Sequence, residues 1–515
     1  MAELNVTQIT EKLNQEFEGE QRKLVFWYDA AAEFADDIST IKLENASILI
    51  LEQRNQFKTK HFLECVDTES NYLIYAPFPK PGIRENHLAD TLLYSREFQA
   101  DRASLLMMDL GINERFKPIL QTHIKFFAAK ERTRKFYDLS LDDYGDKTIP
   151  IGMMSVLSKS KYPTLEDVLR DILLHDGFAQ RDILDEFEKY HLVEPFWEMI
   201  HAMFGYRDDK PSIRKLLIAM FITYIDKTVP TNLPKAWQRL VCGKSGSVIA
   251  FLDNMMHSQI YGDTFDAISS RIAGDIGAAD IFSQFPIEDI VECNVFSGVE
   301  SLIIRWLIER LLNEDTGAKL NKRTIPEVCE ERRRGHFGDK MAHRYTMIEH
   351  AWHLIVNGVY EPRSDLQHVV DYYLEEGYKI DQHYRYFYYH NDAAVYQDAD
   401  QSLYKYFEML RDLVERIYTN SFLNPLIANW NHAFVKNRGK LNLLNQRRFY
   451  DLQVKRKAEK IAVIISDALR YEVGQTLFER LESDPKCESN LTAMQALLPS
   501  FTRICMAALL PHSSL

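Results

Sequence analysis

The chain has 515 residues, of which 46% are apolar and 27% charged, and its net charge is −13. This composition is typical of a folded protein with roughly two to four domains. It argues against a chain that binds nucleic acid nonspecifically over its whole surface. No apolar run reaches the roughly 18 residues of a membrane span, and the N-terminus lacks a secretory signal. The six cysteines are scattered and form no C-x-x-C pair. We therefore expect a bacterial cytoplasmic protein that does not enter a membrane.

Residues 1–110 alternate between short apolar runs and helix-like stretches. The runs Leu24–Tyr28, Ser47–Leu51 and Tyr72–Tyr75 predict three strands, and this alternation is typical of a parallel sheet. Asp29 follows the first strand, but no Gly-rich phosphate loop accompanies it. We interpret this region as a small α/β domain that is structural or binds a partner, in preference to a second enzyme.

In residues 111–435 the strand signal fades and apolar residues recur at spacings of three and four. Thr164–Asp167 follows a proline and predicts the start of a helix. Longer helices are predicted over Ile213–Ile225, Gly298–Leu312 and Leu403–Ile417. This region is therefore predicted to be a large all-helical domain.

Two side-chain clusters in the helical region leave alternatives open. The segment Tyr372–Tyr389 is rich in aromatic and basic residues, which can stack the bases of single-stranded nucleic acid or simply pack helices together. His343, His350 and His353, with Glu349, are either metal ligands or a half-buried polar face. In both cases we favour packing.

The segment Lys436–Lys460 holds nine Lys or Arg residues against two acids, Asp451 and Glu459. Such a segment either steers nucleic acid or a phosphorylated substrate, or is a solvated basic surface. An ATPase is disfavoured, because Gly243–Ser245 resembles the end of a P-loop but Gln238 stands where the loop needs glycine.

The last part of the chain carries the candidate chemistry. Ile461–Ile465 is a β-branched apolar run that predicts a strand buried on both faces, with Asp467 at its carboxyl end. Ser500 and Thr502 stand just before a predicted helix, Arg503–Leu510. Ligands and catalytic groups collect at the carboxyl ends of strands in open α/β sheets, and a helix N-terminus suits phosphate.

The motifs Ser-Asp-Ala-Leu-Arg-Tyr-Glu (466–472) and Pro-Ser-Phe-Thr-Arg-Ile-Cys-Met-Ala-Ala-Leu-Leu-Pro (499–511) resemble the PglZ family. Gln446–Val454 and Phe26–Asp29 are similar to the longer, BREX type I form. This family belongs to the alkaline phosphatase superfamily and to BREX phage-defence systems. The resemblance implies an α/β catalytic domain that begins after a basic connector, within residues 436–515.

The resemblance also implies site roles, with Asp467 as a ligand of a divalent metal, preferably zinc, and Thr502 as a metal-contacting nucleophile. On spacing alone, Asp467 would merely end a strand and Thr502 merely cap a helix; the flanking motifs favour the catalytic roles. Arg470 and Glu472 would orient the loop or pair with each other, without a catalytic role.

The remaining metal ligands of such a domain would lie after Leu515. We therefore expect the chain to stop inside its catalytic domain, to hold no metal stably and to be inactive by itself. The intact protein would be a metal-dependent phosphatase or phosphodiesterase, and residues 1–110 would bind other BREX proteins. The alternative is a non-catalytic scaffold or a nucleic-acid-binding component of the defence complex.

Overall fold

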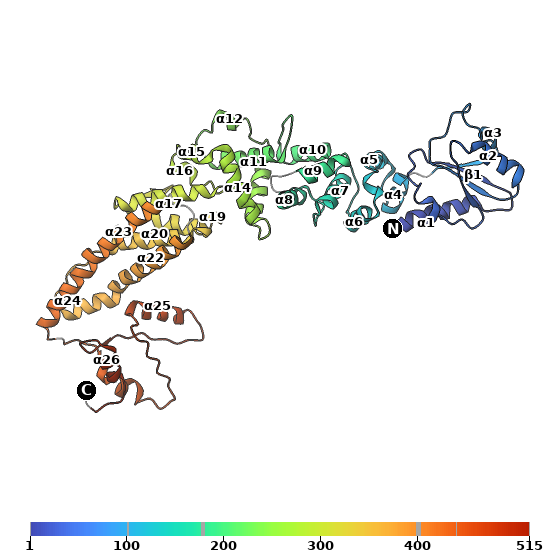
Figure 1. Cartoon of the computed structure of the whole chain (residues 1–515). Helices are drawn as coiled ribbons and strands as arrows, with labels where there is room; N and C mark the ends of the chain where they lie inside the picture. Colours follow the sequence, from blue (N-terminus) through green and yellow to red (C-terminus); the bar gives the residue numbers. More distant parts are fainter. Residues whose placement is uncertain (1, 100–101, 177–180, 398–402, 439, 514–515) are drawn as a thin grey trace. The chain divides into compact units, whose positions relative to one another are not determined.

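The computed structural model describes residues 2–99, 102–176, 181–397, 403–438 and 440–513 (Figure 1). Contacts divide the chain into two compact units, Met1–Thr223 with Arg239–Ile268, and Tyr224–Gln238 with Ser269–Leu515. The protein is mostly helical with a small parallel sheet near its N-terminus, which confirms the predicted class of a multidomain α and α/β protein. The predicted boundaries near residues 110 and 435 stay predictions, because the division by contacts runs through the helical region.

The N-terminal sheet has four parallel strands in the order β2-β3-β1-β4. Its strands are β1 (Leu24–Tyr28), β2 (Ser47–Ile50), β3 (Tyr72–Ala76) and β4 (Arg96–Phe98). The first three confirm the predicted strands to within one residue. The edge strand β4 was not predicted, because its three residues include an arginine and a glutamate and give no apolar run.

The two faces of this sheet are both covered, as its apolar strands require. Val25 and Trp27 point into one core with Ile9 and Leu13 of α1 (Ala2–Glu16), while Leu24 and Phe26 point into the other. Because successive side chains of a strand point to opposite faces, a continuous apolar run fits only a strand buried on both sides. Asp29, at the end of β1, therefore lies against a closed core.

The first unit continues as a series of helices after the sheet. Apart from α11 (Ile213–Thr228) and α14 (Gly262–Ile276), which belong partly to each unit, its helices are α1 (Ala2–Glu16), α2 (Gln56–His61), α3 (Ala89–Leu92), α4 (Arg102–Leu110), α5 (Lys117–Thr122), α6 (Lys130–Asp138), α7 (Thr148–Ser158), α8 (Leu165–Asp176), α9 (Arg181–Lys189), α10 (Val193–Phe204) and α13 (Ser245–Met256). The Thr164 hydroxyl accepts a hydrogen bond from the Asp167 amide (3.2 Å), which confirms the predicted start of α8.

The second unit consists mainly of helices of different lengths. They are α12 (Lys235–Gln238), α15 (Ala278–Phe282), α16 (Ile287–Ile290), α17 (Ser297–Leu312), α18 (Ile325–Arg332), α19 (His336–Lys340), α20 (Ala342–Asn357), α21 (Leu366–Tyr372), α22 (Tyr378–Gln397), α23 (Tyr404–Arg416) and α24 (Asn424–Lys436). The predicted helices over Ile213–Ile225, Gly298–Leu312 and Leu403–Ile417 are confirmed as α11, α17 and α23. A short hairpin of β5 (Lys319–Leu320) and β6 (Arg323–Thr324) interrupts the helical region. No helix in the described parts of the chain is long and apolar enough to cross a bilayer.

The C-terminal segment corrects one prediction. Ile461–Ile465 is not a strand: its backbone is irregular and Ile464 is 92% exposed. A strand forms only where a neighbour takes up its backbone hydrogen bonds, and among the described residues β7 (Leu444–Asn445) pairs with β8 (Met494–Gln495) instead. The helices α25 (Tyr471–Glu482) and α26 (Thr502–Leu509) do form, and α26 confirms the predicted helix after Thr502 to within one residue.

Candidate active site at Asp467 and Thr502

Asp467 lies in a tight turn between the irregular apolar run and α25. The turn places Ala468 at a φ of 56°, and the Ala468 amide donates to the Asp467 carboxylate at 3.0 Å. The carboxylate is exposed. The turn therefore holds the acid at the surface, where it can meet a ligand.

Thr502 is the first residue of α26, and the fold brings it to Asp467. The Thr502 hydroxyl donates to the Asp467 carboxylate, with its Oγ1 3.2 Å from Oδ2 and 3.3 Å from Oδ1. The two residues stand 35 positions apart. The two residues singled out in the sequence thus lie side by side in one exposed site.

The pair offers two oxygen donors to a metal ion. Hard and borderline cations accept carboxylate and hydroxyl oxygen, so the chemistry of the pair fits a divalent metal. Zinc takes about four ligands and magnesium about six. Within the described ranges, no group of three or more His, Cys, Asp or Glu side chains is arranged to hold a metal. Among the described residues, Asp467 and Thr502 thus supply two donors, fewer than either ion takes.

Glu472, five residues after Asp467, is fully buried and pairs with Arg385 of α22. The Arg385 Nε lies 2.9 Å from Oε1 of Glu472, and Nη2 lies 2.8 Å from Oε2. The suggested pairing of Glu472 with Arg470 is therefore wrong, since Arg470 is exposed and the buried carboxylate needs a partner that comes from the core. No sequence signal linked Arg385 to Glu472, which is 87 positions away.

A second polar contact and an aromatic contact join α25 to the helical region. The Gln382 side chain donates to the Thr476 hydroxyl (2.9 Å), and the Tyr471 ring lies 5.8 Å from the Tyr378 ring. Gln382 and Arg385 stand on one face of α22, three residues apart. The helix α25, which follows the Asp467 turn, is thus held against α22 by an ion pair, a hydrogen bond and an aromatic contact.

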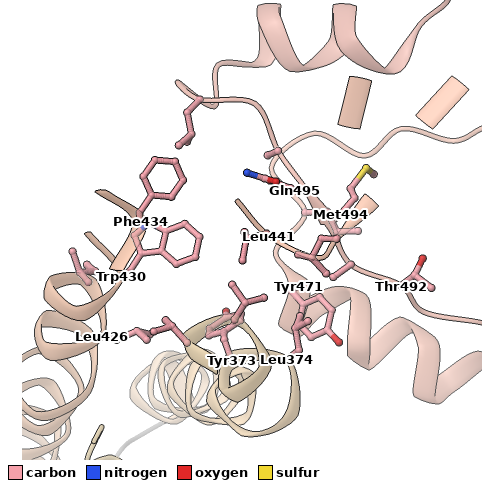
Figure 2. A pocket seen from close by; sticks show the side chains of 18 residues that line it. Tyr373, Leu374, Leu426, Trp430, Phe434, Leu441, Tyr471, Thr492, Met494 and Gln495 are labelled. Carbon is pink, nitrogen blue, oxygen red and sulfur yellow. The ribbon is translucent and has the colours of Figure 1, made fainter. Parts of the chain in front are cut away.

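An apolar pocket of about 560 Å³ borders the same turn. Figure 2 shows the rings of Trp430 and Phe434 on one side of the pocket, and the Tyr471 ring and the Met494 side chain on the other. Leu469, two residues after Asp467, is also part of its wall. The full lining comprises Val369, Val370, Tyr373, Leu374, Leu426, Ile427, Trp430, Phe434, Leu441, Leu443, Leu469, Tyr471, Thr492, Ala493, Met494, Gln495, Ala496 and Leu498.

The aromatic segment Tyr372–Tyr389 is used mainly for packing. Tyr384 stacks on Tyr418 of the neighbouring π-helical segment, with ring centroids 3.7 Å apart. The hydroxyls of Tyr384 and Tyr388 both donate to Glu415, and burial with this hydrogen bond raises the pKa of Tyr384 to about 12. These contacts support the packing interpretation of the segment.

The histidines of the helical region face one another across α20 and α22. His343 meets His390, and His350 meets His383, with Nδ1 atoms 2.7 Å and 2.9 Å apart. Burial lowers the pKa of His350 to about 3 and that of His383 to about 4. The rings therefore form a half-buried seam, as the sequence favoured, and Glu349 pairs with Arg333 at 2.6 Å.

Two other charged positions prove structural. Asp29 is 5% exposed and accepts hydrogen bonds from the Phe34 amide (2.8 Å) and the Tyr75 hydroxyl (2.6 Å), so it closes the loop after β1. Arg332, the last residue of α18, is buried against Glu300. Neither position offers a free charge to a ligand.

The basic segment Lys436–Lys460 stays in solvent. All nine of its basic side chains are exposed, and among the described residues one ion pair involves them, Lys455 with Asp451 at 3.7 Å. The segment runs directly into the Ile461–Ile465 run that precedes Asp467.

Comparisons with known proteins agree with the resemblance of the motifs. Residues 447–515 match the BREX system PglZ alkaline phosphatase-like domain. The alkaline phosphatase-like protein PglZ of Bacillus cereus (strain H3081.97) is 30% identical over 531 residues, covering 99% of this chain and 61% of the relative. The alkaline phosphatase-like protein BrxZ of Escherichia coli O9:H4 (strain HS) is 27% identical over 526 residues, covering 96% of this chain and 60% of the relative.

No solved structure matches the chain. The chain spans about 60% of the length of the curated relatives that it matches, and it is aligned to them along nearly all of its own length. Within the matched C-terminal region lie both Asp467 and Thr502. Along nearly all of its length the chain is therefore similar to these PglZ and BrxZ relatives, and its residues 447–515 match the PglZ alkaline phosphatase-like domain of BREX systems.

Proposed function

We propose that the intact protein is a bacterial, cytoplasmic, metal-dependent phosphatase or phosphodiesterase of BREX phage defence, with Asp467 and Thr502 in its active site. The observation that supports this most directly is the contact between the Thr502 hydroxyl and the Asp467 carboxylate. Asp467 would bind a divalent metal, zinc in the first instance. Thr502 would attack phosphorus and displace the alcohol or phenol of the ester, and water would then release phosphate from Thr502. A bound metal supplies the Lewis acidity that lowers the pKa of the attacking hydroxyl.

The residues of this chain then have separable tasks. The turn at Ala468 presents the Asp467 carboxylate, and the start of α26 presents Thr502 beside unpaired backbone N–H groups that suit a phosphate oxygen. The Asp467 carboxylate holds the Thr502 hydroxyl proton in a hydrogen bond and so orients the oxygen for attack. The Arg385–Glu472 pair fixes the helix that follows the turn.

The test compares the full-length protein with two variants, Thr502→Ala and Thr502→Ser, in hydrolysis of an aryl phosphate mono- or diester with added Zn²⁺. We expect Thr502→Ala to lose at least about a thousandfold in kcat and Thr502→Ser to retain part of it, because serine keeps the nucleophilic oxygen. Ser500→Ala is the matched control, since it removes a neighbouring hydroxyl on the same loop. Full activity of Thr502→Ala would refute the assignment.

We infer that the N-terminal sheet domain docks other BREX proteins. Its carboxylate at the strand end, Asp29, accepts hydrogen bonds from Phe34 and Tyr75 inside the domain, so this acid is not available as a catalytic group. Deleting residues 1–110 from the full-length protein should abolish co-purification with at least one BREX partner and leave hydrolysis largely intact. Unchanged complex formation, or lost hydrolysis in an intact complex, would overturn this role.

A scaffold or nucleic-acid-binding role is the competing proposal. Two observations favour it. Asp467 and Thr502 supply two donors, fewer than a divalent metal needs, and the basic segment Lys436–Lys460 is exposed. Phage defence by cells that carry Thr502→Ala separates the two proposals. Lost defence supports catalysis, and retained defence supports the scaffold.

A further inference from the structure

The apolar pocket of about 560 Å³ lies within the second unit, beside the candidate active site but apart from its two residues. One wall comes from α21, α24 and the turn of π-helix Tyr373–Gly377. The other wall comes from Leu469, Tyr471 and residues 492–498. The proposed hydrolase chemistry uses none of these side chains. The volume falls within the roughly 300–1,000 Å³ of small-molecule sites in proteins.

Aromatic rings line the pocket on two sides. The rings of Trp430 and Phe434 lie on one side, and the Tyr471 ring and the Met494 side chain lie opposite (Figure 2). Trp430 and Phe434 stand four residues apart on α24, with ring centroids 5.8 Å apart and planes 28° apart, so they form one broad aromatic surface. Both side chains are half-buried. A planar ring in the pocket would stack on this surface and contact Met494.

The lining indicates the charge of the ligand. Among the described residues that line the pocket, none is Lys, Arg, His, Asp or Glu. Its polar side chains are Tyr373, Tyr471, Thr492 and Gln495, and the Tyr373 hydroxyl already donates to Asp381. A charged ligand would lose hydration here without gaining a counter-charge, whereas an uncharged ring would bury apolar surface at little cost. The lining therefore selects an uncharged ligand.

Hydrogen bonds hold both walls in place. The Asn442 backbone amide donates to the Gln367 side chain (2.9 Å), which ties the chain after α24 to α21. The Leu497 backbone amide donates to the Gln446 side chain (3.1 Å), and the pairing of β7 with β8 fixes the strand that carries Met494. The pocket is therefore formed before a ligand arrives, so binding does not have to order it.

The shape of the pocket favours a small molecule over a protein partner. Specific protein interfaces bury roughly 800 Å² of surface on each partner. Here the aromatic and aliphatic side chains face one another across a single hollow (Figure 2). Such a hollow surrounds a small ring system and contacts it from two sides.

We propose that this pocket binds an uncharged, ring-bearing small molecule, which joins the helical region to the segment that carries the candidate active site. Leu469 lies two residues after Asp467, and Leu498 lies four residues before Thr502, so the ligand touches the chain next to both. A ligand that binds only the formed pocket stabilises it by mass action. The pocket is therefore an effector site that steadies the two segments holding Asp467 and Thr502.

The test measures binding of phenylnaphthylamine, an uncharged probe whose fluorescence rises in apolar surroundings, to the full-length protein and to the 515-residue chain. Anilinonaphthalene sulfonate is the matched probe, because it adds a negative charge to the same ring system. We expect one uncharged probe per chain, bound at least about tenfold more tightly than the sulfonate. Equal affinity for the two probes, or no binding of the uncharged probe, would overturn the proposal.

A pair of variants locates the probe. Val370→Trp fills the pocket from α21 and should weaken binding of the uncharged probe by at least about tenfold. Val435→Trp makes the same change at an exposed position of α24 outside the lining, and it should bind as the parent does. Equal binding by the two variants would place the probe elsewhere and refute the site.

Should Val370→Trp fail to fold, methyl NMR of the parent decides. The Met494 signal should shift when the uncharged probe is added, whereas that of Met409, exposed on α23 outside the lining, should not. An unmoved Met494 signal refutes the site.

Other occupants of the pocket give distinct results. Probe binding to the 515-residue chain but not to the full-length protein would show that later residues fill the pocket. A dimer that the probe dissociates would show that a second copy fills it. Either result overturns the proposal. Because no measurement depends on hydrolysis, failure of the proposed catalytic function would leave these outcomes unchanged.

Discussion

Arg385 of α22 holds the fully buried carboxylate of Glu472 in a two-pronged ion pair, with Nε 2.9 Å from Oε1 and Nη2 2.8 Å from Oε2. Glu472 is the second residue of α25, the helix that follows the Asp467 turn. This ion pair therefore joins the helical region to the candidate active-site segment. Without Arg385, the buried Glu472 carboxylate would be unpaired, at a large desolvation cost.

Replacing Arg385 by Ala should loosen α25 by about 2–3 kcal/mol, because Glu472 would remain buried without a counter-charge. Hydrogen exchange of residues 467–482 should accelerate by roughly 30- to 160-fold, with little change in α17. Arg411→Ala is the control, since Arg411 is an exposed arginine on α23 whose ion pair is solvated. Equal exchange in the two variants would show that the pair does not fasten α25.

Removing Arg332 should destabilise the second unit by about 3–5 kcal/mol, measured by denaturant unfolding. Arg332 bonds to Glu300, to the Val291 carbonyl (3.0 Å) and to Asn294 (2.7 Å), and Tyr345 also donates to Glu300. Arg332→Ala leaves the 1%-exposed Glu300 charge unpaired. Arg334→Ala, two residues away in an exposed pair with Glu330, should cost less than about 0.5 kcal/mol. Similar losses for both would contradict the buried-pair account.

Stability should fall as the pH drops from about 6.5 towards 4, before most carboxylates titrate. Burial lowers the pKa of His350 to about 3 and those of His383 and His390 to about 4, whereas an unfolded histidine titrates near 6.5. The unfolded state thus binds more protons in this window, so acid favours unfolding, while above pH 6.5 the full stability is present. Each ring should contribute on the order of 1 kcal/mol by pH 5, after allowance for partial exposure.

Thermal unfolding between pH 7.5 and 5 measures this effect, and His350→Asn should flatten the profile. His432→Asn should leave the dependence of thermal stability on pH unchanged, because His432 is exposed on α24 and is not part of the histidine seam. A parallel profile for His350→Asn would assign the acid sensitivity to other groups.

The 515-residue chain should show no metal-dependent turnover of an aryl phosphate ester. Its described residues offer Asp467 and Thr502 as two oxygen donors, which is fewer than a divalent metal needs. The measurement is release of nitrophenolate in the presence of Zn²⁺ or Mn²⁺. Turnover that Thr502→Ala abolishes would prove this prediction wrong and would show that the pair assembles a working site.

The basic segment should account for most binding of the chain to polyanions. Changing Lys455, Arg456, Lys457 and Lys460 to Gln should lower the salt slope of single-stranded DNA binding by roughly 2–3, at about 0.7 per contact. The control changes four lysines that are scattered over the second unit, Lys319, Lys322, Lys340 and Lys405. Fluorescence anisotropy over a range of salt concentrations distinguishes the two sets, and equal slopes would remove the segment from any nucleic-acid role.

The elements that depend on local pattern could be predicted from the sequence. The run Leu24–Tyr28 is five apolar residues, and it became a strand with those bounds. The helices α11 and α17 followed apolar spacings of three and four, and α26 followed the hydroxyl that begins it. Motif and position together singled out Asp467 and Thr502, whose side chains the structure brings into contact.

Contacts between distant residues were decided by the tertiary structure. The pairing of Arg385 with Glu472, and of His350 with His383, depends on how helices pack, and charge patterns along the chain carry no information on that packing. The expected pairing of Glu472 with its neighbour Arg470 failed for this reason. Burial selects the partner that reaches the carboxylate inside the protein, whatever its distance in sequence.

The runs Leu24–Tyr28 and Ile461–Ile465 show where local pattern stops being sufficient. Both consist of apolar residues suited to a buried strand, yet the first lies between β3 and β4 while the second is irregular and exposed. Composition sets the propensity of a run for the extended conformation. Neighbouring strands must supply its hydrogen bonds and cover its side chains, and only the tertiary structure decides whether those neighbours are there.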